Sequence, residues 1–309
     1  MFDAPVSPDG YRWWYLDVVS DDGEHALTLI VFVGCVFSPF YFAARARGAT
    51  RPQAHPAWNV ALYGPRGQRG WVLTERDAPA LHAARDHLLL GPNRLGWEGD
   101  DLVARFDERT APLGFPLRGE VRLHAGQRFD HPVALDPAGR HHWRAVAPFA
   151  RAEVTLDEPR LAFTGSAYHD TNWGEEPLEA AFASWNWSRA EVPDGAVVLY
   201  DSVLRGGGER PLGLRFGKDG TVTPVEVPRV VTLPRTGWLM PRATRCDAGG
   251  EARVVWTLED APFYERSVLE STLLGHRARG FHESVDLDRF VSRTVQFMLP
   301  FRMRRELSR

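Results

Sequence analysis

Apolar residues along this chain recur in short runs that end at glycine, proline or aspartate. Such runs are typical of antiparallel β-structure, and the Asp-Gly dipeptides at 22–23, 194–195 and 219–220 fit hairpin turns. Helical spacing is scarce between the runs, which disfavours a parallel α/β fold. The pattern therefore predicts an all-β protein, with strands at 26–32, 59–63, 71–74, 102–106, 117–123, 196–204, 212–216, 227–233 and 252–258.

One long segment occurs twice in altered form. WWYLDVVSDDGEHALTLIVF, from Trp13, is echoed by WNWSRAEVPDGAVVLYDSVL, from Trp185. Each copy runs from two tryptophans through a charged strand and an Asp-Gly turn to an apolar strand. We interpret the echo as two related β units in tandem, residues 1–145 and 146–309, joined near Pro132, Pro137 and Pro148. A hairpin that recurs by chance is the alternative interpretation.

Residues 26–44 carry no charge, and their number would suffice to span a bilayer. Gly34, Ser38 and Pro39 interrupt the stretch, and its β-branched residues favour a buried strand followed by a turn.

The end of the chain shows the one clear helical period. It predicts a helix over Ser284–Leu299, with Ser284 or Asp286 as its cap and Pro300 as its stop. Residues 289–309 hold six arginines against Glu306, with aromatic residues between them. Such a tail suits contact with an anionic membrane surface. The alternative is a helix packed on a barrel with its arginines in water.

Composition excludes several classes of protein. Eleven Trp and 17 Phe among 309 residues exclude a disordered chain, and a net charge of −3 disfavours nucleic-acid binding. Cys35 and Cys246, the two cysteines, provide neither a disulfide framework nor a cysteine zinc site, which fits a cytoplasmic location. Signatures of phosphate-binding loops, dinucleotide folds, zinc proteases and serine hydrolases are missing from the sequence. His141, His142 and His169 lack metal-ligand spacing, so we expect no metal.

Two places concentrate candidate chemistry. In GSAYHDTNWGEEPLE, residues 165–179, His169, Asp170, Asn172 and Trp173 lie within five positions. A turn stabilised by Asp170 and Asn172 is the structural alternative there. Asp201 is expected on an apolar strand face, where burial would keep its carboxyl protonated and able to donate a proton. The alternative interpretations are that Asp201 lies at a strand end in water or forms an ion pair with an arginine.

The sequence resembles the acyclic carotenoid 1,2-hydratases, or hydroxyneurosporene synthases, of purple photosynthetic bacteria. The resemblance covers most of the chain and is carried by SPDGYRWWYLDVVSDDGEHALTLIVFVGCVFSPFY, WNVALYG, WVLTER, GSAYHDTNWGEEPLE, WNWSRA, HESVDLDRF and MLPFRMRR. It implies a lipocalin-like superfamily with two β units in tandem. Members of the wider family often have a second histidine where this chain has Thr171.

The resemblance implies cofactor-independent addition of water to the terminal C1=C2 bond of an acyclic carotene such as neurosporene or lycopene. An acid would protonate C2, and water would add to the tertiary cation at C1. We expect Asp201 as the acid, with Asp170 second, either as the acid or as the group that positions His169. His169 or Tyr200 would deprotonate the water.

The binding surface is expected to be aromatic, because aromatic faces stabilise cations. Residues expected to line the cation site or the substrate tunnel are Trp173, Trp185, Trp187, Asn172, Trp13, Trp14, Phe37 and Tyr41.

Two other functions stay open at this point. A pericyclase or cyclase of a polyene would need the apolar pocket without an obligatory acid, and a lipid or pigment carrier would need the cavity alone. For the hydratase, the expected partners are the apolar polyene and water, with peripheral contact to the inner membrane through the basic tail.

Overall fold

The fold is described from a computed structural model, which covers residues 1–48, 50–65 and 67–308. Strands account for 58% of the described residues and helices for 10%, so the predicted all-β class is confirmed. The chain divides into two compact units. Unit 1 comprises Met1–Ala134, Ala138–Pro177 and Gln296–Arg309, and unit 2 comprises Leu135–Pro137 and Leu178–Val295.

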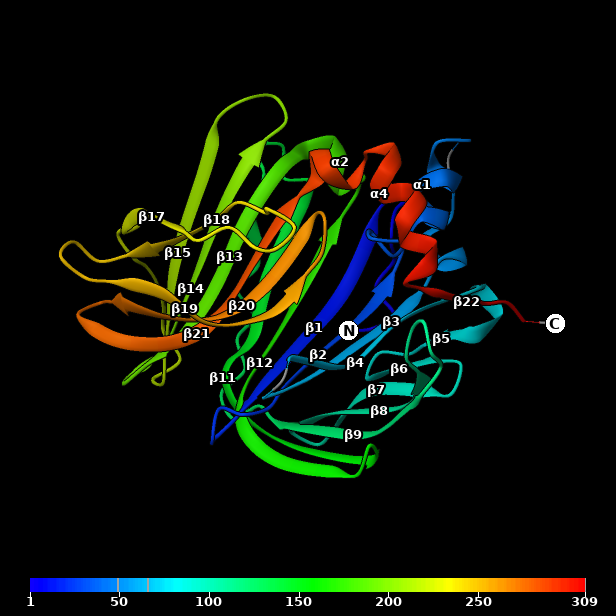
Figure 1. Ribbon diagram of the computed structural model, residues 1–309, viewed down its shortest axis with the longest axis horizontal. Helices are drawn as coiled ribbons and strands as arrows, with labels where there is room; N and C mark the ends of the chain where they lie inside the picture. The colour runs from blue at the N-terminus through cyan, green and yellow to red at the C-terminus, as the bar shows by residue number, and fades with distance from the viewer. Residues whose placement is uncertain (49, 66, 309) are drawn as a thin grey trace. The chain divides into compact units, whose positions relative to one another are not determined.

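Unit 1 is built on one large sheet, coloured blue to green in Figure 1 except for the red strand β22. Its strands are β1 (Tyr11–Ser20), β2 (Ala26–Val33), β3 (Ala57–Gly64), β4 (Gly67–Arg76), β5 (Leu81–Ala83), β6 (His87–Leu90), β7 (Asn93–Glu98), β8 (Asp101–Arg109), β9 (Pro116–His124), β10 (Val133–Ala134), β11 (His141–Glu158), β12 (Leu161–Gly174) and β22 (Arg304–Glu306). They follow the order β22-β4-β3-β2-β1-β12-β11-β9-β8-β7-β6-β5, with β10 beside β11. Helix α1 (Pro39–Arg45) and two short 3-10 helices, Pro52–Ala54 and Ala78–Ala80, connect strands.

The sheet of unit 1 curls around a hydrophobic core. Leu29 and Val60, from strands on one side of the sheet order, share this core with Leu95 and Leu123 from the other side. Because side chains alternate between the faces of a strand, one face of β1 contributes Trp14, Leu16 and Val18 to the core. Its opposite face is also buried and carries the residues of the candidate site described below.

Unit 2 has a seven-stranded antiparallel sheet and a two-stranded one, drawn in green, yellow and orange in Figure 1. The larger sheet has the order β16-β15-β14-β13-β21-β20-β19. The strands of the unit are β13 (Phe182–Val192), β14 (Gly195–Leu204), β15 (Glu209–Gly217), β16 (Val222–Pro224), β17 (Arg229–Leu233), β18 (Arg242–Cys246), β19 (Ala252–Asp260), β20 (Tyr264–Leu273) and β21 (His276–Asp286). The β17–β18 hairpin is held to the larger sheet by side chains of Arg242 and Arg245.

Both copies of the sequence echo form the predicted hairpin. The first copy is β1 and β2, and the second is β13 and β14. The Asp-Gly turns place Gly23 and Gly195 at positive φ, which glycine adopts without strain. The uncharged stretch 26–44 forms β2 and most of α1, as a strand followed by a turn. Among the described residues, no helix has the length and apolar character needed to cross a membrane.

Of the three prolines expected to mark the linker, Pro148 lies in β11, an 18-residue strand, and Pro132 and Pro137 precede that strand. β11 runs through Pro148, where its pairing with β12 shifts register between Ala147 and Ala150. A strand tolerates proline at such an irregularity, because no ladder hydrogen bond needs its missing N–H. The expected boundary at 145/146 lies inside β11. The compact units therefore divide the chain elsewhere, after Pro177, and the chain returns to unit 1 at Gln296.

The single helix predicted over Ser284–Leu299 is replaced by shorter elements. Ser284 lies in β21, and the helical residues form α3 (Leu287–Phe290), α4 (Arg293–Met298) and a 3-10 helix, Leu299–Phe301. Ser284 and its neighbours pair with β13 and β20, so sheet hydrogen bonding prevails over helical spacing there. Asp286 caps α3, as one of the two expected caps, by accepting from Arg289 N at 2.9 Å. The remaining helix, α2 (Leu178–Ala181), precedes β13.

The arginine-rich tail of the chain completes the sheet of unit 1. Strand β22, red in Figure 1, pairs in parallel with β4, with Arg305 opposite Glu75. Arg305 Nε lies 3.0 Å from the buried Glu75 carboxylate, and Arg76 bonds Glu306 at 3.0 Å. The positive charge of Arg305 is thus paired with a carboxylate inside unit 1. Arg309, the last of the six arginines, lies outside the described residues.

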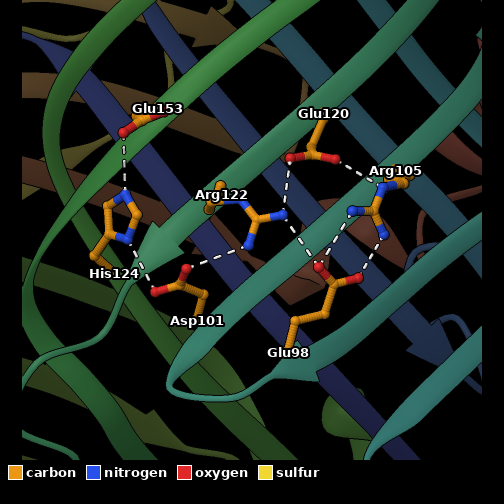
Figure 2. A network of polar contacts seen from close by, with 7 residues as sticks. All are labelled: Glu98, Asp101, Arg105, Glu120, Arg122, His124 and Glu153. Carbon is orange, nitrogen blue, oxygen red and sulfur yellow. Dashed lines mark hydrogen bonds and ion pairs between the residues drawn. The ribbon is translucent and has the colours of Figure 1, made fainter.

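Charged side chains cross-link the strands β7, β8, β9 and β11 on a partly exposed face (Figure 2). Arg122 bonds Glu98 at 3.1 Å and Asp101 at 3.2 Å. His124 bridges Asp101 at 2.9 Å and Glu153 at 3.2 Å, and these two carboxylates raise its pKa above the usual value. Each such pair contributes little by itself in water. Together the pairs favour the observed strand register.

Candidate functional site

The polar-aromatic cluster predicted at 165–179 begins on β12, where neighbouring residues point to opposite faces of the sheet. Tyr168, Asp170 and Asn172 share one face, and His169 lies on the other. Across the sheet, Asp170 is opposite Tyr15 on β1 and Ala145 on β11. The sequence cluster is therefore divided between two environments.

Asp170 is buried, with 3% of its surface exposed, and two neighbours hold its carboxyl group. Trp143 Nε1 and the Tyr168 hydroxyl each donate to Oδ2 at 2.8 Å. Tyr15 packs edge-on against Tyr168, with 6.1 Å between the ring centroids. The site thus combines a fixed carboxyl group with aromatic surfaces.

His169 lies on the core face of unit 1. Its Nδ1 is 2.8 Å from the carbonyl oxygen of Tyr15, so Nδ1 carries the proton and donates. Burial lowers the pKa of His169 to about 4, which keeps the imidazole neutral near pH 7. The expectation that Asp170 positions His169 is not supported, because the two side chains leave β12 on opposite faces.

Two further residues of the cluster lie on the His169 face. Thr171, where the wider family often has histidine, donates its hydroxyl to the Trp13 carbonyl at 2.8 Å. The Trp173 ring stacks with His142 at 5.1 Å and has the Arg12 guanidinium 4.9 Å from its centroid. Trp173 thus already contacts a cation of the protein.

A second polar chain lies farther along the Asp170 face. The Tyr11 hydroxyl is 2.9 Å from His141 Nδ1, and His141 Nε2 is 3.5 Å from Glu176 Oε1. A Cβ at Gly174 would lie 2.5 Å from the Tyr11 ring and 2.8 Å from His141 Nδ1. Glycine therefore makes room for this contact. This series of polar side chains connects the buried phenol of Tyr11 with the partly exposed carboxylate of Glu176.

No role was predicted from the sequence for Tyr11, His141, Trp143 or Tyr168. The alternation of side chains places His141 and Trp143 on one face of β11, and Tyr11 lies on β1. The pairing of these two strands with β12, which brings the residues together, is not visible in the sequence.

The aromatic residues expected from the first unit separate into different places. Trp13 stacks on Tyr11 with centroids 4.9 Å apart and continues through Phe32 toward Phe37. Trp14 is part of the hydrophobic core and packs on Phe2. Tyr41 is buried, donates its hydroxyl to the Gly10 carbonyl at 2.6 Å, and lies beside Arg45.

Asp201 lies in unit 2 on β14, where it shares a face with Val197 and Leu199 as expected. Its side chain is 22% exposed and forms an ion pair with Arg245, whose Nε is 2.9 Å from Oδ1 and 3.0 Å from Oδ2. The dry, arginine-free environment expected for an acid at Asp201 is therefore not present.

Tyr200, Trp185 and Trp187 occupy the opposite face of the larger sheet of unit 2. Trp187 is directly across from Tyr200, and Trp185 is across from Ser202. All three aromatic side chains are buried. The structure thus brings these three together and separates them from the Asp201 carboxylate.

On the Asp201 face of that sheet, on strands β20 and β21, Glu265 and His282 form a buried pair that was not predicted from the sequence. Glu265 Oε1 lies 3.3 Å from His282 Nε2, and its Oε2 accepts from Ser267 at 2.6 Å. Burial raises the pKa of Glu265 to about 7 and lowers the pKa of His282 to about 3. Arg242, 3.4 Å from Glu265, opposes the first of these shifts.

Solved structures similar to this chain share its fold at low sequence identity. A putative AttH protein from Nitrosomonas europaea matches with a TM-score of 0.58 and 15% identity, over 89% of this chain and 92% of its own. CghA bound to Sch210972 also has a TM-score of 0.58, with 12% identity over 90% of this chain and 88% of its own.

Sequence comparison is more specific. The family model described as carotenoid hydratase CrtC matches residues 29–309. The acyclic carotenoid 1,2-hydratase of Thiocapsa roseopersicina is 50% identical over 98% of this chain and 75% of its own length. The enzyme of the same name from Rubrivivax gelatinosus is 44% identical with the same coverage, and that from Cereibacter sphaeroides is 39% identical over 90% of this chain. The chain therefore belongs to the carotenoid hydratase family and is a hydro-lyase enzyme.

Proposed function

We propose that this enzyme adds water across the terminal C1=C2 bond of an acyclic carotene, such as neurosporene or lycopene, and yields a tertiary 1-hydroxy carotenoid without a cofactor. Family membership supports the reaction class. The observation that carries the mechanism is the buried Asp170 carboxyl group with two donors on one of its oxygens.

Asp170 is the proposed acid. Burial favours the neutral form of a carboxyl group, and in that form Oδ2 is the carbonyl oxygen that accepts from Trp143 and Tyr168, while Oδ1 carries the proton. When the proton passes to C2, negative charge develops on the carboxyl group. The two hydrogen bonds then strengthen, so they stabilise the transition state more than the ground state.

The cation left at C1 would be tertiary and close to aromatic rings. Tyr15, Tyr168, Trp13 and Trp143 lie on the same sheet face as Asp170. Each aromatic face that contacts the cation is expected to stabilise it by roughly 0.5–2 kcal/mol. No carbonyl or phosphate group of the substrate is needed for this chemistry.

Water adds at C1 and must lose a proton. His169 and Tyr200, expected for this step from the sequence, lie on the opposite sheet face and in unit 2, respectively. We propose Tyr11, which faces the same side as Asp170, because its proton can pass to His141 Nδ1 while the Nε2 proton of His141 passes to Glu176. Over the whole cycle, the added water loses one proton and Asp170 regains the one that it gave to C2. The net reaction is therefore alkene plus water to alcohol.

Asp170→Asn and Asp201→Asn test the acid. Asparagine at 170 keeps an oxygen that accepts from Trp143 and Tyr168, so folding should persist, but no acidic proton remains. We expect hydration, followed as a mass gain of 18 on a carotene in detergent or lipid, to fall by at least the ~10²–10⁴ typical of general acid catalysis. Asp201→Asn should retain most activity.

The opposite ranking would assign the acid to Asp201, and normal turnover by both variants would refute a carboxyl acid at either position. If the wild type converts the carotene to an isomer it is a cyclase, and if it binds the carotene unchanged it is a carrier. Either result would refute the proposed hydration.

The carotene dissolves in a bilayer, so we also propose a cytoplasmic enzyme in peripheral contact with the inner membrane. The arginine-rich end of the chain supports this proposal, although Arg305 is engaged by Glu75 inside unit 1.

A further inference from the structure

Four of the large apolar side chains that unit 1 exposes to solvent lie in two short segments. Leu113 and Phe115, in the loop between β8 and β9, are 74% and 62% exposed. Phe297 and Phe301, near the end of the chain, are 71% and 66% exposed, and their ring centroids are 5.5 Å apart. Exposed apolar side chains that gather in one place mark an interaction surface.

Contacts around Trp71 bring the loop and the end of the chain together. The Trp71 carbonyl accepts from Ala111 N at 3.0 Å, and its ring lies 4.7 Å from the Arg302 guanidinium. At the tip of the loop, a Cβ on Gly114 would lie 3.9 Å from Arg304 Nη1. The pairing of β22 with β4 fixes the end of the chain at this place.

The charge around the four apolar side chains is mainly positive. Arg302 and Arg304 follow Phe301, and Arg109 donates to the Gly114 carbonyl at 3.2 Å. The nearby carboxylate, Glu306, is bonded by Arg76 at 3.0 Å and by Arg304 at 3.4 Å. Apolar tips with arginines beside them fit a bilayer, where the tips enter the acyl region and the arginines meet anionic headgroups.

We propose that the β8–β9 loop and residues 297–304 form one docking surface for an anionic lipid bilayer. The surface rests on the proposed function, because a carotene substrate resides in the bilayer. It also changes the role of the tail, since a loop more than 180 positions earlier supplies two of the four exposed apolar side chains of this surface.

Vesicle co-sedimentation tests the surface, with phosphatidylcholine vesicles that contain or lack phosphatidylglycerol. The variants are Leu113→Ser with Phe115→Ser, and Phe297→Ser with Phe301→Ser. Val230→Ser with Leu274→Ser is the matched control, because both side chains are exposed and belong to unit 2. All six side chains are exposed, so the substitutions should not disturb folding.

We expect the wild type and the control to bind vesicles containing phosphatidylglycerol more tightly than the neutral ones. Each double variant of the surface should lower the partition coefficient about tenfold, because transfer of even one phenyl ring from water is worth about that factor. Hydration of a detergent-solubilised carotene should be unchanged in every variant.

If the variant with Leu113→Ser and Phe115→Ser binds vesicles as tightly as the wild type, the loop is not part of the docking surface. If the wild type binds both kinds of vesicle equally, the proposed preference for anionic lipid is wrong. If the variants instead lose self-association while vesicle binding stays the same, the surface is a contact between copies of the chain. The detergent assay separates these outcomes from failure of the proposed hydration, because it requires no vesicle.

Discussion

Acid should destabilise this protein in part through His169, whose imidazole is buried in neutral form. Its pKa is about 4 in the folded chain and about 6.5 when unfolded. Below 6.5 the unfolded state binds the proton and the folded state does not, so stability falls as the pH drops from 6.5 to 4. At pH 5 the loss from this one group is about 2 kcal/mol, and below pH 4 it approaches about 3 kcal/mol.

His169→Asn isolates this contribution, because the asparagine amide can occupy the position of Nδ1 and donate to the Tyr15 carbonyl. Chemical denaturation followed by tryptophan fluorescence would give the free energy of unfolding at pH 7 and pH 5. The wild type should lose about 2 kcal/mol more than the variant between these pH values. His82→Asn, at an exposed position of β5, should behave like the wild type. Parallel losses in the wild type and His169→Asn would refute the burial argument.

Two further predictions concern contacts in unit 1. Gly174→Ala should lower the melting temperature and cost about 1–3 kcal/mol, because the new Cβ would displace Tyr11 or His141; an unchanged melting temperature would contradict the close approach. The pKa of His124 is higher in the folded chain than in the unfolded chain, so protonated His124 stabilises the fold when the pH is below its unfolded-state pKa. This contribution is lost as the pH rises through the folded-state pKa. His124→Gln should therefore destabilise by less than about 1 kcal/mol in urea at pH 5.5 and hardly at all at pH 9, and an equal effect at both would count against the contacts in Figure 2.

The sequence predicted elements that depend on local patterns. The β1–β2 and β13–β14 hairpins follow from alternation and Asp-Gly turns, both of which act over a few residues. The prediction of a helix at 284–299 is wrong in its first part, because Ser284 lies in β21 and pairs with β13 and β20. Strand β13 lies about 100 residues earlier in the sequence. Local spacing carries no information about such partners.

The candidate site shows the same limit. The strand face of Asp201 was predicted correctly, but its partner Arg245 is 44 positions away, on a hairpin whose docking the sequence does not show. Trp143 and Asp170 are 27 positions apart and meet because β11 and β12 pair. Both faces of β1 are buried, so its sequence lacks the polar alternation that would reveal a site face.

The pairing of β22 with β4 has a consequence for synthesis on the ribosome. Strand β4 emerges more than 200 residues before its partner, so its outer edge is open while all of unit 2 is being made. An open strand edge is a template for pairing with other chains. Nascent chains crowded on one messenger are thus exposed to mispairing until Arg304–Glu306 leave the ribosome, and a stalled or shortened product would keep that edge permanently.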